Sequence, residues 1–208
     1  MAFTLSPYAL TTLEHAKQQI GIPDADTNYD DILTRFINSC SNIIENYCDR
    51  KILARDYTDY FSGNNQRNFM LSQWPIQTID EVWIDQNSMF DDSNDQLDST
   101  EYAIDQLSDD SIGIILLGGQ VFPVGIRNIK VVYNAGYSSV PAEIEEACLW
   151  WVDNLYTMRD NRSINTKSKG KNNENTTYRD DLPDVVKNMI APYVRCEFPN
   201  LAIPSRHG

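Results

Sequence analysis

The hydrophobic positions of the chain follow a helical period near both ends and a strand-like period between them. From residue 32 to residue 47, apolar side chains recur every three or four positions for more than four turns, which predicts a long amphipathic helix. Shorter helices are predicted at residues 13–20, 142–159 and 182–194. A stripe as wide as that of the long helix needs partner helices. We therefore expect five residues to be buried against one another, namely Phe36, Ile37, Ile44, Trp151 and Leu155.

The middle of the chain contains five or six short segments that are typical of strands. They carry alternating β-branched and aromatic residues and lie at 52–61, 68–71, 76–85, 102–104, 112–117 and 129–134. Because no helical pattern separates them, they predict an antiparallel sheet. The final segment turns at Gly136, which tolerates a positive φ, and leads directly into the helix that begins near Ala142. Residues 129–156 therefore connect the sheet with the helices.

These patterns predict an α+β protein: a bundle of three to four helices with an inserted antiparallel β-sheet and an extended C-terminal tail. We divide the chain into 1–51 (N-terminal helices), 52–137 (inserted β region), 138–160 (core helix), 161–178 (flexible basic loop) and 179–208 (C-terminal helix and tail).

The starts of three helices are predicted from their flanking polar residues. Thr11 and Glu14 have the spacing of a capping box for the first helix, which should end at Gly21. Residues 24–29 should supply the cap of the long helix, and Ser138 or Ser139 that of the helix after Pro141.

The charge of the 208-residue chain restricts its partners. A net charge of −13 disfavours wrapping of nucleic acid, because duplex affinity comes mainly from neutralised phosphates. The chain contains neither a run of apolar residues long enough to cross a bilayer nor an N-terminal signal pattern, so we expect no membrane role.

The four cysteines show no C-x-x-C spacing and are predicted to be buried thiols in a reducing compartment: Cys40, Cys48, Cys148 and Cys196.

Acidic and basic residues are segregated along the chain. Residues 80–110 contain eleven acids and no base; Asp91 to Asp98 resembles a calcium loop but lacks its glycine and terminal glutamate, so a solvated, self-repelling loop is predicted. The polar segment 161–177 is basic, and it is either a mobile loop or a contact for phosphate or an acidic partner. If the segment is a contact, we expect phosphate or the acidic partner to be bound by Arg162, Lys167, Lys169 and Lys171.

Catalytic motifs are missing from the sequence. It has no Gly-rich phosphate loop and no G-x-S-x-G, and His15 is expected to be a surface or packing residue. We therefore predict no enzyme activity, no cofactor and no metal site. The alternative of a small carboxylate-based hydrolase would use Asp105 and Asp109.

The order of the motifs resembles a known family. Ile43-Ile-Glu-Asn-Tyr-Cys-Asp-Arg50 ends the long helix, Leu71-Ser-Gln-Trp-Pro75 follows, and Val131-Val-Tyr-Asn-Ala-Gly-Tyr137 with Val140-Pro141 precedes the core helix. Leu182-Pro183 and Ala191-Pro-Tyr193-Val-Arg195 come last. This arrangement resembles the head–tail connector (adaptor) family of tailed bacteriophages over most of the chain.

The resemblance implies a structural virion protein at the head–tail interface, assembled in the host cytoplasm. Such a protein docks on the portal protein after DNA packaging, forms a twelve-fold homo-oligomeric ring, and receives a stopper or tail terminator protein. Double-stranded DNA passes through its lumen without sequence-specific binding. The alternative within this class is a tail-side terminator or neck protein.

The C-terminal tail is the segment expected to dock. Its large apolar residues are separated by prolines and polar residues, which allow no regular packing within the segment. We assign portal docking to Arg195, Phe198, Leu201 and Ile203.

Overall fold

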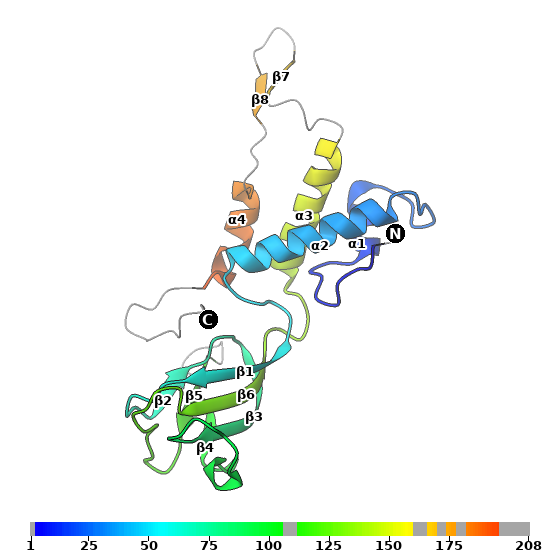
Figure 1. The fold of residues 1–208 in the computed structure, drawn as a ribbon. Helices are drawn as coiled ribbons and strands as arrows, with labels where there is room; N and C mark the ends of the chain where they lie inside the picture. The colour runs from blue at the N-terminus through cyan, green and yellow to red at the C-terminus, as the bar shows by residue number, and fades with distance from the viewer. Residues whose placement is uncertain (1–2, 106–111, 160–165, 170–173, 178–181, 196–208) are drawn as a thin grey trace. The chain divides into compact units, whose positions relative to one another are not determined.

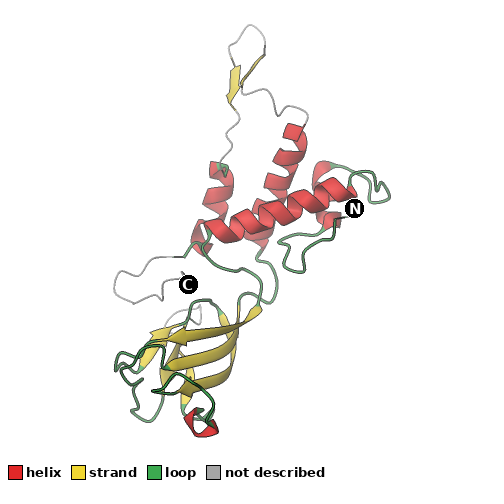
Figure 2. Cartoon of the chain, in the orientation of Figure 1, coloured by secondary structure: helices red, strands yellow, loops and turns green. Residues whose placement is uncertain are grey.

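The computed structural model describes residues 3–105, 112–159, 166–169, 174–177 and 182–195, the two short ranges 166–169 and 174–177 by their backbone alone. These residues form an α+β structure whose helices and strands are drawn in Figures 1 and 2. The chain divides into two units, which we call the helical unit (described residues 3–50 and 140–195) and the β unit (residues 51–139).

The helical unit contains the four α-helices of the described residues: α1 (Leu13–Ile20), α2 (Asp30–Tyr47), α3 (Ala142–Met158) and α4 (Asp184–Ile190). A 3₁₀ turn, η4 (Ala191–Tyr193), follows α4. α2 runs across α3 (Figure 1), α1 packs against both, and α4 packs against α3.

The core of the helical unit agrees with the helical period in the sequence. Phe36, Ile37, Ile44 and Trp151 are buried, as predicted, whereas Leu155 is only half-buried because it lies in the last turn of α3. The apolar stripe of α2 was predicted too wide. Ile43 and Tyr47, counted on that stripe, are exposed, and the buried positions of this part of the helix also include Ser41 and Glu45.

The starts of the helices differ in part from the predicted caps. α1 is capped by Thr12, whose side chain accepts a hydrogen bond from the His15 backbone N–H, rather than by Thr11. Gly21 ends this helix with φ 80°, as predicted. The N-caps of α2 and α3 are Tyr29 and Pro141, and neither makes a side-chain capping bond. The acidic residues of the first turns stabilise these starts instead, through the helix dipole.

The β unit contains two three-stranded antiparallel sheets where the sequence predicted one. β6 (Ile129–Ala135) lies between β1 (Arg55–Phe61) and β3 (Ile76–Ile84). In the second sheet, β5 (Gly113–Leu116) lies between β2 (Asn68–Met70) and β4 (Tyr102–Asp105). The strand segments were located correctly, but their alternation does not define which strands pair, because three of the four pairings join residues more than 40 positions apart.

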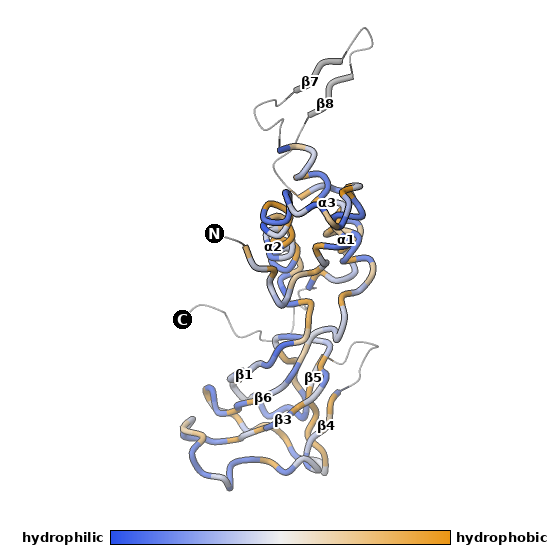
Figure 3. Tube along the Cα trace, turned by 90° about the vertical axis from the view of Figure 1, so that its right-hand side faces the viewer, coloured by the Kyte–Doolittle hydropathy of each residue, from blue (hydrophilic) through white to orange (hydrophobic). Residues whose placement is uncertain are grey.

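One hydrophobic core serves both sheets of the β unit. It includes Phe61, Val82 and Val131 from the first sheet, and Ile114 and Tyr102 from the second. Figure 3 shows the alternation of hydrophilic and hydrophobic positions along these strands. At the end of β6, Gly136 has φ 121°, and a Cβ there would lie 2.7 Å from the backbone of residues 53 and 54. Only glycine therefore fits this turn.

Segment 161–178 was predicted as a loop, but part of its backbone is regular. β7 (Thr166–Lys169) pairs antiparallel with β8 (Glu174–Thr177). Threonine is enriched in strands, and β8 ends in two threonines, which accounts for the ladder in an otherwise polar segment.

Candidate assembly surfaces

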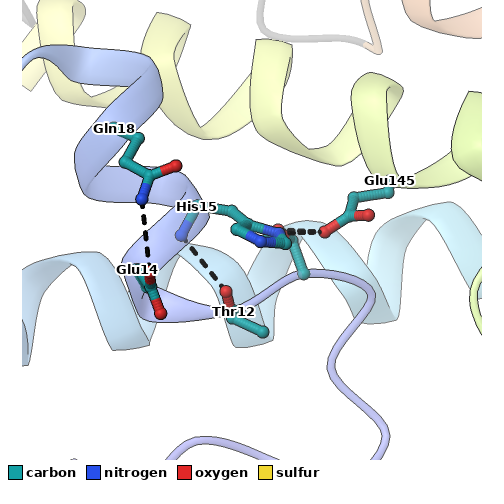
Figure 4. Close-up of polar contacts among 6 residues, drawn as sticks. Thr12, Glu14, His15, Gln18 and Glu145 are labelled. Carbon is teal, nitrogen blue, oxygen red and sulfur yellow. Dashed lines mark hydrogen bonds and ion pairs between the residues drawn. The ribbon is translucent and has the colours of Figure 1, made fainter.

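A polar cluster joins α1 to the start of α3. His15 Nδ1 lies 2.6 Å from Glu145 Oε1, and the Thr11 hydroxyl donates to the same oxygen at 3.1 Å. Figure 4 shows this cluster together with Gln18, whose amide donates to Glu14 at 3.3 Å. The hydrogen bond and the charge of Glu145 raise the pKa of His15 above its ordinary value of 6.5. His15 is therefore a surface residue, as predicted, but one that connects two helices.

The segment before α1 is fixed to α2 by side chains of α2. The Leu10 N–H donates to the buried Ser41 hydroxyl at 3.0 Å, and the Ser6 N–H donates to Asn38 Oδ1 at 2.9 Å. The turn after α1 is fixed by the buried Lys17, whose ammonium group donates to the Asp24 carbonyl and forms an ion pair of 2.6 Å with Asp30. The N-terminal part of the helical unit is therefore rigidly placed.

The described chain ends at a second polar contact of the helical unit. After η4, the Arg195 backbone N–H donates to the Cys48 carbonyl at 2.9 Å, and the Arg195 guanidinium lies 3.9 Å from Asp49. The Tyr193 hydroxyl donates to Glu143 on α3 at 2.9 Å. These bonds attach the chain up to residue 195 to the ends of α2 and α3.

The other residues assigned to assembly from the sequence are only partly described. Phe198, Leu201 and Ile203 lie outside the described residues, as do Arg162 and Lys171. The backbone of β7 places Lys167 opposite Thr176 and Lys169 opposite Glu174. Arg195 is described, and it contacts Cys48 and Asp49 at the end of α2.

The acidic segment is more ordered than the solvated loop predicted for it. Asp85 is buried, and its carboxylate accepts hydrogen bonds from three backbone N–H groups. Asp92 caps the 3₁₀ turn η1 (Ser93–Asp95), and Asp98 accepts from the Thr100 N–H. These acids satisfy turn amides, which explains why so many can stand close together. The prediction of solvation is wrong for Asp85.

Another polar network, which the sequence did not predict, lies in the β unit. The Tyr133 hydroxyl of β6 donates to Asp59 of β1 at 2.6 Å and accepts from the Gln73 N–H at 3.2 Å. The Ser72 hydroxyl lies 3.0 Å from the Tyr133 hydroxyl and donates to Asp59. Burial and the adjacent Asp59 carboxylate raise the pKa of Tyr133. The network connects the sheet with the chain between β2 and β3.

The described residues contain no group of three or more His, Cys, Asp or Glu side chains arranged to hold a metal. None of the helices that they form is long and apolar enough to cross a bilayer. Asp105 accepts a hydrogen bond from Asn68 at 2.9 Å, and Asp109 lies outside the described residues.

The cysteines agree with the sequence prediction where they are described. Cys40, Cys48 and Cys148 are buried free thiols, and Cys196 lies outside the described residues. Burial raises the pKa of Cys48 to about 11 and that of Cys148 to about 12. Such thiols are protonated and unreactive at neutral pH.

The fold is shared with chains of gene transfer agent particles. The chain is similar to chains in three solved structures, in each case over 100% of this chain and 98% of the other. They come from the neck of the native gene transfer agent (GTA) particle computed with C12 symmetry (TM-score 0.60, 13% identity), the virion of the native GTA particle (0.58, 14%) and the neck of the empty GTA particle computed with C6 symmetry (0.56, 14%). A comparison with curated proteins gave no match.

The sequence itself defines the family. Residues 9–196 match the model of the head completion protein family, which covers nearly all of both units. The chain therefore belongs to the head completion protein family, and the resemblance inferred from its motifs is confirmed at this level.

Proposed function

We propose that this protein is a head–tail connector that docks on the portal ring after DNA packaging and forms the ring to which the stopper or tail attaches. The observation that carries the proposal is the family match over residues 9–196. It is supported by similarity in fold, over the whole chain, to proteins of GTA necks. The role is structural, and it places the protein at the head–tail interface of the virion.

A ring requires two different complementary surfaces on each subunit, because its interfaces are heterologous. The helical unit offers exposed apolar residues at two places, Ile43 and Tyr47 on α2 and Tyr8 in the segment before α1. One of the similar structures was computed with C12 symmetry, which supports a twelve-fold ring for this chain as well. The net charge of −13 suits a lumen through which DNA slides without binding.

Docking on the portal is assigned to Arg195 and to residues 197–208, which contain Phe198, Leu201 and Ile203. The bonds of Arg195 to Cys48 and Asp49 complete the described helical unit just before this segment. Phe198, Leu201 and Ile203 could each contribute about 1.5–3 kcal/mol of burial in a portal groove, offset by the cost of ordering the segment. Repetition around a ring multiplies a weak gain per subunit.

Truncation tests this proposal. Deleting Glu197–Gly208 should leave the melting temperature nearly unchanged and abolish binding to purified portal-bearing heads, whereas the full chain binds them and forms rings in negative-stain images. A matched control replaces Phe198, Leu201 and Ile203 with serine and keeps the chain length. Full head binding by the truncated chain would refute the assignment, and loss of folding would place the segment in the subunit core. Binding of the full chain to tails and not to heads would favour the tail-side terminator.

A further inference from the structure

Two loops of the β unit hold apolar side chains in water. Met89 is 72% exposed, Val124 69% and Ile126 85%. The loops lie against each other, since the Ser88 hydroxyl donates to the Ile126 carbonyl at 3.0 Å and the Asp85 N–H donates to the Asn128 carbonyl at 2.9 Å. We call Met89, Val124 and Ile126 the loop-tip surface. Single exposed apolar residues are ordinary, but several strongly exposed ones on two adjoining loops favour an interaction site there over the rest of the unit.

Buried polar groups hold both loops in place. The carboxylate of Asp85, 5% exposed, accepts from the N–H groups of Asn87 and Met89 at 2.7 Å each and of Phe90 at 2.9 Å. In the other loop, the buried Asn128 amide donates to the Pro123 carbonyl and accepts from the Gly63 N–H, both at 2.9 Å. Burial of a carboxylate is unfavourable unless it is hydrogen-bonded, so these bonds fix the backbone that displays the loop-tip surface.

The backbone of the two loops is also unusual. Among the described residues, five non-glycine residues have positive φ, and three of them are here: Ser88 (57°), Phe90 (54°) and Arg127 (49°). This region is sterically unfavourable for side chains larger than glycine, above all for phenylalanine. Such conformations concentrate at functional sites, where the surroundings enforce them. The apolar side chains are therefore displayed by a preorganised structure.

Charge next to the loop-tip surface restricts what can cover it. Asp91 and Asp92 follow Phe90 directly and are exposed. The pKa of Asp95 is raised by partial burial and by the neighbouring carboxylates Asp85, Asp92 and Asp91, which shows the negative potential of this region. Arg127 lies over the Tyr60 ring, 5.3 Å from its centre. A complementary partner therefore needs an apolar groove bordered by lysine or arginine.

A second copy of this chain does not fit that description. If two copies met through this surface, Asp91 and Asp92 of one copy would lie against those of the other, and their like charges would repel. The one basic segment, residues 161–177, has Ile164 as its sole large aliphatic residue and cannot form an apolar groove. An anionic membrane is disfavoured by the same carboxylates.

We propose that the loop-tip surface is a docking site for a different protein of the particle, one that presents an apolar groove bordered by basic side chains. The inference rests on the proposed function, because the particle neck is where such a partner would be met. The partner is separate from the portal contact assigned to residues 197–208.

Photo-crosslinking in assembled particles tests the site. A photoreactive phenylalanine analogue is placed at position 89 or 126, and at Val185 on α4 as an exposed apolar control. We expect positions 89 and 126 to crosslink one and the same other virion protein through a peptide containing lysine or arginine, and position 185 not to reach that peptide. Crosslinks to another copy of this chain, or no more crosslinking than at position 185, would overturn the docking site. Absence of the chain from purified particles would instead overturn the proposed function.

Paired substitutions provide a second measurement. The double variant Met89→Ser with Ile126→Ser should melt within about 2 °C of the wild type, because exposed side chains contribute little to folding. It should retain the crosslinked partner about tenfold less well or worse, since apolar anchors dominate binding. The control Val185→Ser should retain it normally. Equal retention by the double variant and the control would exclude a docking role for these two side chains.

Discussion

Replacing Tyr133 with phenylalanine should destabilise the β unit without changing the shape of its core. Phenylalanine keeps the ring and loses the hydroxyl, which donates to Asp59, accepts from the Gln73 N–H and lies 3.0 Å from the Ser72 hydroxyl. A hydrogen bond to a charged group contributes about 1.5–3 kcal/mol, and a buried N–H left unpaired costs about 1–3 kcal/mol. The Ser72 hydroxyl still donates to Asp59, so these effects do not add fully. We expect a loss of about 2–4 kcal/mol.

Hydrogen–deuterium exchange measures this loss in the β unit separately from the helical unit. At 1.4 kcal/mol per factor of ten, amides of β6 that exchange through unfolding of the β unit should exchange roughly 30- to 700-fold faster. Amides of α3 should be unchanged. Tyr60→Phe is the matched control, because the Tyr60 side chain on β1 is exposed. If Tyr133→Phe left the exchange of β6 within about twofold of the control, the network would contribute nothing to stability and our reasoning would be wrong.

Three further results are expected. Phe36→Ala should lower the unfolding free energy by about 3–5 kcal/mol, measured by chemical denaturation, because Phe36 is buried. A melting temperature within about 2 °C of the wild type would contradict the assignment of Phe36 to the core of the helical unit. His15→Gln should cost about 0.2–1 kcal/mol of unfolding free energy at pH 6 and nothing at pH 9. The pKa of His15 is raised in the folded state, so its contribution to stability is fully present below pH 6.5 and is lost as the pH rises through the folded-state pKa. An equal effect at both pH values would exclude the charged pair with Glu145. If Lys167, Lys169 and Lys171 contact phosphate or an acidic partner, replacing all three with glutamine should weaken particle assembly and make it less dependent on salt concentration. Unchanged assembly at low salt would exclude that contact.

Local periodicity was enough to locate the elements but not to pair them. The strands of the β unit lie where alternation placed them, within a few residues, because each strand segment carries its own pattern. The position of β6 at the centre of its sheet depends on pairing with β1, whose residues lie more than 60 positions away in the sequence. The alternating pattern alone therefore does not show whether the strands form one sheet or two.

The polar contacts were missed for a related reason. Glu145 lies 130 residues from His15, and Tyr133 lies 74 residues from Asp59, so nothing in the local sequence connects them. Asp85 stands in a run of acids that are mostly solvated, and only the hydrogen bonds of its own loop distinguish it. Assignment to the family was easier, because the motifs near the ends of the elements are local.

The insertion of the β unit into the helical unit determines an order of events during synthesis. α1 and α2 are made first, but α3, against which they pack, is completed only at residue 158. At 5–20 residues per second, roughly 5–20 s separate the end of α2 from the end of α3. The β unit is continuous and can fold on the ribosome within that interval, while Phe36, Ile37 and Ile44 still face water. The nascent chain is therefore most prone to aggregation, and most in need of chaperones, between the synthesis of α2 and that of α3.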